Sequence, residues 1–296
     1  HRHRVSRRAA LGAGAVAAVA GGYWFTRRST DLLTGTPSSD STPTSTPTTT
    51  PTRTIPTRAE LVQKYAGRVP REWGLDVTGM PSRTDSPGVL LTLDLCGGPG
   101  GAGLDHKLID LLVQHGIPAG VFVNARWIDA NPGAVEKLVA TGLIDIGNHG
   151  TTHRPLSVTG RSAYGINGTT DVGAAVDEVL GCQEKLTAIT GQPPRWFRSG
   201  TAHYDEVAVE IVREIGAIPV GFSVNGDAGA TASAPAVAAA LRGARPGDIV
   251  IAHANRPGRS TFEGFARALP GLIAGGTRFV RLTAGELVSD GSPQGW

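Results

Sequence analysis

Three apolar segments of this sequence run directly into side chains that bind metals or move protons. These side chains are, in chain order, Asp94, Cys96, His149, His153 and His253. Because His149 and His153 are four positions apart, one turn of chain can present both imidazoles to a divalent metal. A carboxylate such as Asp94 can accept a proton, and a third imidazole can return one. Each residue alone also fits a loop cap or a hydrogen-bonded loop histidine, but together they suit metal-assisted hydrolysis.

The elements that must position these side chains are strands. Apolar runs of strand length alternate with helical patterns from about residue 88 to 283. This alternation is typical of βα units around a parallel sheet, in which the loops after the strands carry the chemistry. Asp94, His149 and His253 each stand at or just after the end of such a run. We therefore expect an α/β fold that gathers these residues at one end of its sheet.

Five short motifs occur in a characteristic order along this region. They are Thr92-x-Asp94, Asn148-His149-x-x-x-His153, Phe197-Arg198, Asp227 and Ile251-x-His253. The series resembles the polysaccharide deacetylase family, which is also called the NodB-homology family or carbohydrate esterase family four. The resemblance covers about residues 88–283. It implies a distorted (β/α) barrel and a divalent metal that helps to hydrolyse N- or O-linked acetyl groups of a glycan. Zinc is the metal favoured by two histidines with a carboxylate or thiolate third ligand.

The resemblance also implies a role for each matched residue. His149 and His153 match the metal-binding histidines, and Asp94 matches the general base. Arg198 matches the arginine that orients this base, and His253 matches the histidine that protonates the leaving group. The acid that tunes this histidine would be Asp227, although no tryptophan follows it as in relatives.

The chain departs from the family pattern at the third metal ligand. Relatives have two adjacent aspartates in the first motif and use the second as a ligand, whereas this chain has Leu95 there. In an extended strand Asp94 and Cys96 point to one face and Leu95 to the other. The third ligand is therefore predicted to be Asp94 or Cys96. A disulfide to Cys182 would remove Cys96 from this choice, but Cys182 lies on an apolar helical arc, which favours a buried thiol.

The substrate side of the site also differs from relatives. The segment 198–205 lacks their proline–aromatic pair, which changes the expected wall of the acetyl pocket. Trp127 and Trp196 follow strand-like runs and suit either stacking on sugars or packing between helix and sheet. The residues predicted to bind the substrate are Trp196, Tyr204 and Asn255.

The composition of the chain changes along its length. With 296 residues and 40% hydrophobic residues, it can bury one sizeable core. The net charge is +3, and residues 1–58 carry eight arginines against two aspartates, which leaves −3 for the remainder. The basic character therefore belongs to the N-terminal segment, and no nucleic-acid-binding surface is expected.

Four segments follow from these patterns. They are an export signal or membrane anchor (1–35), a disordered Ser/Thr/Pro-rich linker (36–58), a lead-in (59–87) and a deacetylase-like catalytic domain (88–290). Arg7 and Arg8 before an apolar run are typical of twin-arginine export, while the same run between arginines also fits a short anchor. Both alternatives predict a protein that is exported or held at the outer face of the cytoplasmic membrane, close to the cell wall.

Three functions remain open at this stage. The first is a metal-dependent hydrolase that deacetylates a cell-wall or extracellular polysaccharide. The second is a glycan-binding module that lost hydrolysis through the change at Leu95. The third is a hydrolase of another carbon–nitrogen bond in a non-sugar substrate, because a fold does not determine a function.

Overall fold

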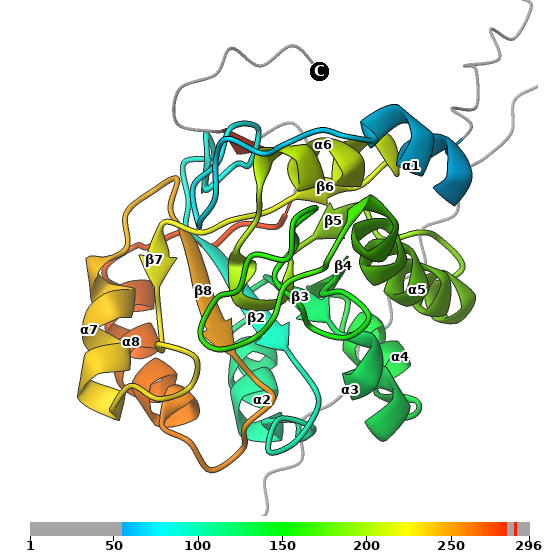
Figure 1. Cartoon of the computed structure of the whole chain (residues 1–296). Helices are drawn as coiled ribbons and strands as arrows, with labels where there is room; N and C mark the ends of the chain where they lie inside the picture. Colours follow the sequence, from blue (N-terminus) through cyan, green and yellow to red (C-terminus); the bar gives the residue numbers. More distant parts are fainter. Residues whose placement is uncertain (1–54, 283–286, 289–296) are drawn as a thin grey trace, which may run out of the picture. The chain divides into compact units, whose positions relative to one another are not determined.

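The computed structural model describes residues 55–282 and 287–288 of the 296-residue chain (Figure 1). The predicted export signal or anchor and residues 36–54 of the predicted linker lie outside the described residues. Among the residues that are described, no helix combines the length and apolarity needed to cross a membrane.

Strands and helices alternate along the described residues. The strands are β1 (Arg83–Thr84), β2 (Leu90–Leu95), β3 (Ala119–Val123), β4 (Ile144–Asn148), β5 (Trp196–Phe197), β6 (Ile218–Pro219), β7 (Val224–Asn225), β8 (Ile249–His253) and β9 (Leu287–Val288). The α-helices are α1 (Arg58–Tyr65), α2 (His106–Gln114), α3 (Ala125–Ala130), α4 (Ala134–Ala140), α5 (Val172–Thr190), α6 (Glu206–Glu214), α7 (Ala234–Gly243) and α8 (Thr261–Ala274).

A parallel sheet of seven strands forms the centre of the fold. Its strand order is β6-β5-β4-β3-β2-β8-β7, and every neighbouring pair is parallel. The sheet curls into a half-barrel with β6 and β7 at its two edges. Strands β1 and β9 form a separate antiparallel pair. The predicted α/β fold of distorted-barrel type is therefore confirmed.

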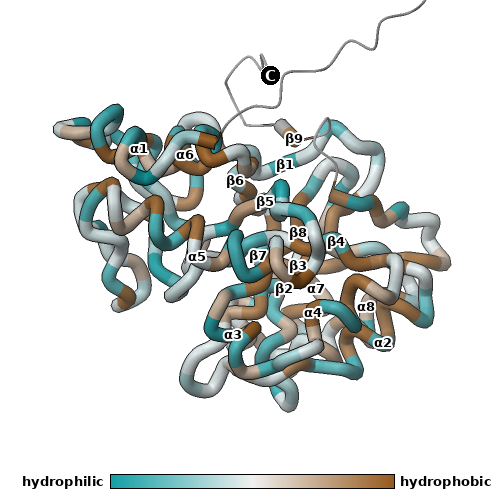
Figure 2. The backbone as a smooth tube through the Cα atoms, turned by 90° about the vertical axis from the view of Figure 1, so that its right-hand side faces the viewer, coloured by the Kyte–Doolittle hydropathy of each residue, from teal (hydrophilic) through white to brown (hydrophobic). Residues whose placement is uncertain are grey.

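The side chains of β2 alternate between two faces of the sheet. Leu91, Leu93 and Leu95 pack in the largest core cluster together with residues of helices α2 and α8. Leu90 belongs to a different cluster on the other face, and Asp94 shares that inner face by its position in the strand. Figure 2 shows the apolar stretches concentrated along the central strands. Because side chains of a strand alternate between its faces, every second residue of β2 points to the inside of the half-barrel.

The lead-in packs on the outside of the half-barrel. Helix α1 begins with a capping box between Thr57 and Glu60, a pattern that satisfies free N–H groups of the first turn. Its Leu61 and Tyr65 are buried in a cluster with residues of α5 and α6. Helix α5 is capped at its N-terminus by Asp171, which accepts a hydrogen bond from Ala174 N. The lead-in and these two helices therefore share one core.

Candidate functional site

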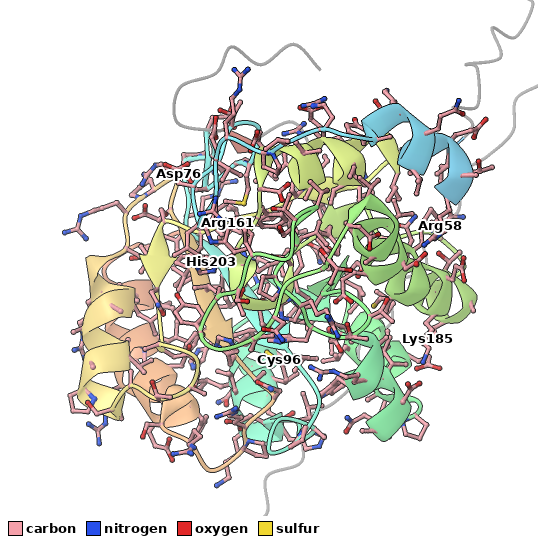
Figure 3. All side chains as sticks on the ribbon, viewed as in Figure 1. Arg58, Asp76, Cys96, Arg161, Lys185 and His203 are labelled. Atoms are coloured by element: carbon pink, nitrogen blue, oxygen red, sulfur yellow. The ribbon has the colours of Figure 1, made fainter. Side chains whose placement is uncertain are left out.

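The side chains predicted to do chemistry meet at the carboxyl ends of the parallel strands. Asp94 in β2 is the register partner of His253 in β8. His149 directly follows β4 and Arg198 directly follows β5, and these two strands are neighbours in the sheet. Figure 3 shows Cys96, the first residue after β2, close to the centre of the molecule. A cavity of about 550 Å³ opens between these strand ends.

Cys96, His149 and His153 form a group suited to hold a metal ion. Their ligand atoms all lie within 4.8 Å of one another, and Cys96 Sγ is 3.7 Å from His149 Nε2. In a tetrahedral zinc site, bonds of about 2.3 Å to sulfur and about 2.0 Å to nitrogen would put these two atoms about 3.5 Å apart. The group therefore has the donor types of a zinc site, and the Cys96–His149 pair is close to the spacing of one.

The backbone around His149 prepares its ring for this task. His149 Nδ1 lies 2.8 Å from the carbonyl oxygen of Arg198. A carbonyl only accepts hydrogen bonds, so Nδ1 must carry the proton and Nε2 keeps its lone pair. Metal-binding histidines in proteins are usually held by a hydrogen bond of this kind. The free Nε2 faces Cys96 and Asp94, at 3.7 Å from Sγ and 3.6 Å from Asp94 Oδ2.

His153 is held in an unusual backbone conformation. Its φ is +64°, in the left-handed region that residues other than glycine rarely adopt. The ring lies edge-on to His149 with 4.8 Å between centroids. Gly200 passes so close that an added Cβ would lie 2.2 Å from the carbonyl carbon of His153. This close approach requires glycine at position 200.

Glu178 of helix α5 clamps the chain on both sides of His153. Its carboxylate accepts hydrogen bonds from Thr152 N at 3.0 Å, Thr152 Oγ1 at 2.6 Å and Arg154 N at 3.1 Å. Glu178 is buried, and these donors replace the water that a buried carboxylate loses. The clamp offsets the strain of the left-handed residue between its two anchor points.

Asp94 is paired with the buried guanidinium of Arg198. Asp94 Oδ1 accepts a hydrogen bond from Arg198 Nη1 at 2.9 Å, and Arg198 also donates to Thr92 Oγ1 and to the carbonyl of Gly221. Burial alone would raise the pKa of Asp94, but the Arg198 charge, with His149 and His253, lowers it below its ordinary value. Asp94 is therefore a carboxylate at neutral pH, and its Oδ2 is the oxygen that faces His149.

His253 is held by Asp227, the acid expected to orient it. Asp227 Oδ1 lies 2.9 Å from His253 Nδ1, and its Oδ2 accepts hydrogen bonds from His253 N and Thr261 Oγ1. Burial opposes the charged imidazole, but the bond to Asp227 and the contact with Cys96 raise the pKa of His253 well above its ordinary value. A protonated His253 at the cavity can act as a general acid.

Comparison with known proteins agrees with this geometry. A family profile described as polysaccharide deacetylase matches residues 82–220. This matched stretch, just under half of the chain, is similar to that family. A curated chitooligosaccharide deacetylase from Sinorhizobium fredii is 35% identical over 80 residues, which are 27% of this chain and 35% of that protein. The chain thus matches about a third of the length of this curated relative.

Solved structures show the same deacetylase fold. A family 4 carbohydrate esterase from Streptomyces lividans in complex with acetate aligns with a TM-score of 0.56 at 23% identity, over 69% of this chain and 97% of that one. A pseudoenzyme of the same family from Bacillus anthracis aligns with a TM-score of 0.57 at 20% identity, over 68% of this chain and 66% of that one. Relatives of this deacetylase fold therefore include a pseudoenzyme as well as enzymes.

Cys96 and Cys182 are both free thiols. Cys182 is buried in the core, where its Sγ donates to the carbonyl of Val123 and burial raises its pKa to about 12. Burial also opposes ionisation of Cys96, but contacts with His149, His153 and His253 lower its pKa well below the ordinary value. No disulfide joins Cys96 to Cys182, so the Cys96 thiol stays available as a metal ligand.

Two residues predicted to bind the substrate lie elsewhere. Trp196 begins β5 and packs in the core cluster around Phe122, away from the strand ends that form the site. Tyr204 is fully buried, and its hydroxyl accepts from Ser199 N and donates to the carbonyl of Phe197. Both predictions were wrong because these rings fill the core. Trp127 is likewise buried in the core, and its Nε1 donates to the carbonyl of Gly103.

Asn255, the third residue predicted to bind the substrate, lines the cavity, and Thr201 lines it as well. The Oδ1 atom of Asn255 and the Oγ1 atom of Thr201 are both buried without a hydrogen-bond partner among the described residues. Thr201 has a φ of +70°, which is a strained conformation for a β-branched residue. The segment that lacks the family's proline–aromatic pair thus contributes a polar group to the cavity wall.

An aromatic cluster stands at the rim of the cavity. Tyr164 lines the cavity and is 75% exposed, and its ring meets His203 edge-on at 5.1 Å. Trp73 lies 5.8 Å from His203, and Arg161 stacks on the Trp73 ring. Arg161 and His203 are labelled in Figure 3. Sequence patterns did not single out Tyr164, because its loop has no periodicity.

Proposed function

We propose that this chain is an exported, metal-dependent deacetylase that removes N- or O-linked acetyl groups from a cell-wall or extracellular glycan. The observation that carries the proposal is one cavity with three groups of residues at its strand ends. Cys96, His149 and His153 form a donor set for a metal. The Asp94 carboxylate is paired with the guanidinium of Arg198, and the His253 ring is paired with Asp227. The predicted signal or anchor at residues 1–35 would bring the enzyme to its glycan.

The metal would be held by Cys96 Sγ, His149 Nε2 and a ring nitrogen of His153. Zinc suits one thiolate with two imidazoles, and three protein ligands are typical of catalytic zinc sites. When bound, such an ion polarises a carbonyl and makes water more acidic. Leu95 cannot take part because its side chain is buried in the core on the opposite face of β2.

With Cys96 as the third ligand, Asp94 is left to move a proton. Its Oδ1 is held by Arg198, whereas Oδ2 faces the histidines of the metal group. A carboxylate fixed in this way can take the proton from water as it attacks the acetyl carbon. Arg198 keeps the carboxylate charged and prevents it from turning away.

His253 supplies the proton that the departing sugar amine or alcohol needs. Its Nδ1 is bonded to Asp227, so its Nε2 is the nitrogen left for the substrate. Asp227 Oδ1 contacts the ring at Nδ1, and His253 N and Thr261 Oγ1 fix the carboxylate by donating to its Oδ2. Asp94 and His253 are register partners on adjacent strands, which places the base and the acid next to each other at the end of the sheet.

Polar and aromatic groups around the cavity bind the sugar. Asn255 Oδ1 and Thr201 Oγ1 are unpartnered atoms that suit hydroxyl or amide groups of a glycan. Tyr164 at the rim presents an exposed ring on which a sugar face can stack. Thr201 and Tyr164 thus take the place of Trp196 and Tyr204 in the proposed substrate-binding set, and Asn255 stays in it.

The test is acetate release by the full chain from peptidoglycan, chito-oligosaccharides and acetyl-xylan. We expect release that stops after chelation and returns with zinc, and the substrate with the highest rate names the glycan class. Saturable glycan binding without release from any substrate would instead support the binding-module alternative, which the loss of the family's second aspartate at Leu95 favours. Release from small amides alone would support the non-sugar hydrolase.

A further inference from the structure

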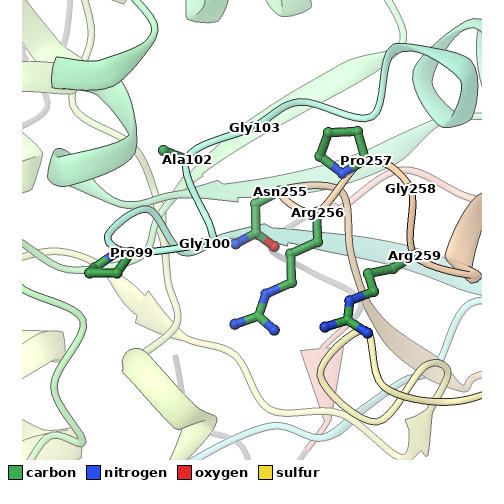
Figure 4. Close-up of a pocket in the computed structure, with 9 residues that line it drawn as sticks. All are labelled: Pro99, Gly100, Ala102, Gly103, Asn255, Arg256, Pro257, Gly258 and Arg259. Atoms are coloured by element: carbon green, nitrogen blue, oxygen red, sulfur yellow. The ribbon is translucent and has the colours of Figure 1, made fainter.

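A second cavity adjoins the proposed acetyl site. It has a volume of about 670 Å³ and lies between the glycine-rich loop after β2 and the loop after β8 (Figure 4). Pro99, Asn255 and Arg256 line both cavities. A chain of sugars with one residue at the acetyl site can therefore extend into the second cavity.

Two arginines dominate the chemistry of this second cavity. Arg256 and Arg259 both line it, and Figure 4 shows their guanidinium groups on the same side of the loop after β8. Neither guanidinium has an ion pair or a hydrogen bond with a side chain or carbonyl of the described residues. By contrast, Arg83, Arg198 and Arg281 are each paired with an aspartate. The charges of Arg256 and Arg259 are thus available to a ligand.

The surroundings add positive charge and little negative charge. Arg126 lines the neighbouring acetyl site. Among the described residues that line the two cavities, the acidic one is Asp94, which is buried and already paired with Arg198. Asp105, Glu263 and Lys107 line a neighbouring hollow, which shares Arg259 with the second cavity. Since residues outside the N-terminal segment carry a net charge of −3, this local excess of arginine is not a general property of the domain.

Asn255 adds a second, independent sign of a ligand. The side chain is 2% exposed, its Nδ2 donates to the carbonyl of Gly101 at 2.9 Å, and its Oδ1 has no partner among the described residues. A buried amide oxygen without a partner costs free energy unless a ligand or water donates to it. The amide oxygen of Asn255 only accepts hydrogen bonds and therefore cannot bind an anion. The ligand must present a hydroxyl or N–H group to this oxygen, next to the anionic group that the arginines bind.

We propose that the second cavity is a subsite for a sugar that carries a carboxylate or phosphate, next to the sugar that is deacetylated. Guanidinium groups bind these two anions through paired hydrogen bonds, and Asn255 accepts a hydroxyl of the same glycan. This inference rests on the proposed function and adds the class of substrate, an acetylated anionic glycan.

The experiment compares oligosaccharides of equal length, all of them acetylated. One is a neutral chito-oligosaccharide, one carries a lactyl-ether carboxylate on alternate sugars, and one carries a phosphate. Equilibrium binding is measured by calorimetry, and acetate release is measured in parallel. We expect the wild type to bind one of the anionic glycans about tenfold more tightly than the neutral one. The anion that binds more tightly distinguishes carboxylate from phosphate.

The variant that tests the subsite is Arg256→Gln/Arg259→Gln, and the matched control is Arg267→Gln on the exposed face of α8. The double variant should bind anionic and neutral glycans equally, while the control keeps the preference. A wild type without preference, or a double variant that keeps it, overturns the subsite. Because binding is measured separately, a preference without acetate release would overturn the proposed function alone, and release without a preference would overturn the subsite alone.

Discussion

The Sγ atom of Cys96 lies 3.7 Å from Nε2 of His149, on the inner side of the half-barrel. The family's usual third ligand is an aspartate at the position of Leu95, but Leu95 is buried in the core on the opposite face of β2. Moving the ligand by one residue, from 95 to 96, returns it to the inner face. With Cys96 as the proposed ligand, Asp94 is left as the proposed base, and the site should be sensitive to thiol chemistry.

Alkylation of the metal-free protein should separate the two cysteines. We expect iodoacetamide at neutral pH to modify Cys96, whose pKa the neighbouring imidazoles lower, and to spare Cys182, whose pKa burial raises to about 12. Zinc added beforehand should protect Cys96. Mass spectrometry of the peptides measures both effects. Equal labelling of the two cysteines, or labelling of Cys96 that zinc leaves unchanged, would argue against the ligand assignment.

Replacing the clamp residue should weaken the metal site. Glu178→Gln removes the charge and exchanges Oε2 for an NH₂ group, which cannot accept the bonds that Thr152 N and Thr152 Oγ1 donate there. We expect the zinc affinity to fall about 10–100-fold, as for other groups that orient metal ligands. Competition with a chelator measures it. Glu184→Gln, on the exposed face of the same helix, is the control and should leave the zinc affinity unchanged. An unchanged zinc affinity in Glu178→Gln would show that Glu178 does not support the metal site.

The alkaline limit of activity should depend on Asp227. Activity needs protonated His253, so it is lost as pH rises through the pKa of His253, which Asp227 raises. Asp227→Asn removes the carboxylate and lowers that pKa, so the alkaline limb of kcat should move to lower pH. The measurement is the pH profile of acetate release in both proteins. A limb that stays in place would show that His253 is not the group that titrates.

Breaking the buried pair should be costly for stability. Arg198→Met leaves the Asp94 carboxylate buried without its cation, which typically destabilises a protein by about 3–5 kcal/mol. Urea unfolding at neutral pH measures this loss. In the wild type the lowered pKa of Asp94 adds stability above its unfolded pKa of about 3.9, and this is lost as pH falls through the folded value. The free energy of unfolding of Arg198→Met should not show this decrease at acidic pH. A decrease of the same size in both proteins would contradict the pairing of Asp94 with Arg198.

The sequence predicted the architecture, and the gathering of the candidate site residues at one edge of the sheet, for a physical reason. Asp94, His149 and His253 stand where apolar strand runs stop, and the carboxyl ends of parallel strands meet at one edge of a sheet. Alternation within β2 also showed that Leu95 and Cys96 face opposite sides. Periodicity and strand order thus carry much of the information about this site.

The rest of the site depends on contacts between distant segments. Trp196 was misplaced because it begins the two-residue strand β5 and therefore lies away from the carboxyl end. Tyr164 and Arg256 come from loops without periodicity, so only the folded chain shows that they line one cavity. Glu178 was detectable, because an acid on the apolar arc of α5 between Ala175 and Cys182 must find partners when buried.

The most direct test of the account measures bound zinc and acetate release on the same samples of wild type, Cys96→Ala and Cys182→Ala. If Cys96, His149 and His153 hold the metal, wild type and Cys182→Ala should retain zinc through dialysis and release acetate. Cys96→Ala should lose zinc and acetate release together, and should regain release only at a much higher zinc concentration. Full zinc retention and full acetate release by Cys96→Ala would contradict the claim that Cys96, His149 and His153 hold the metal.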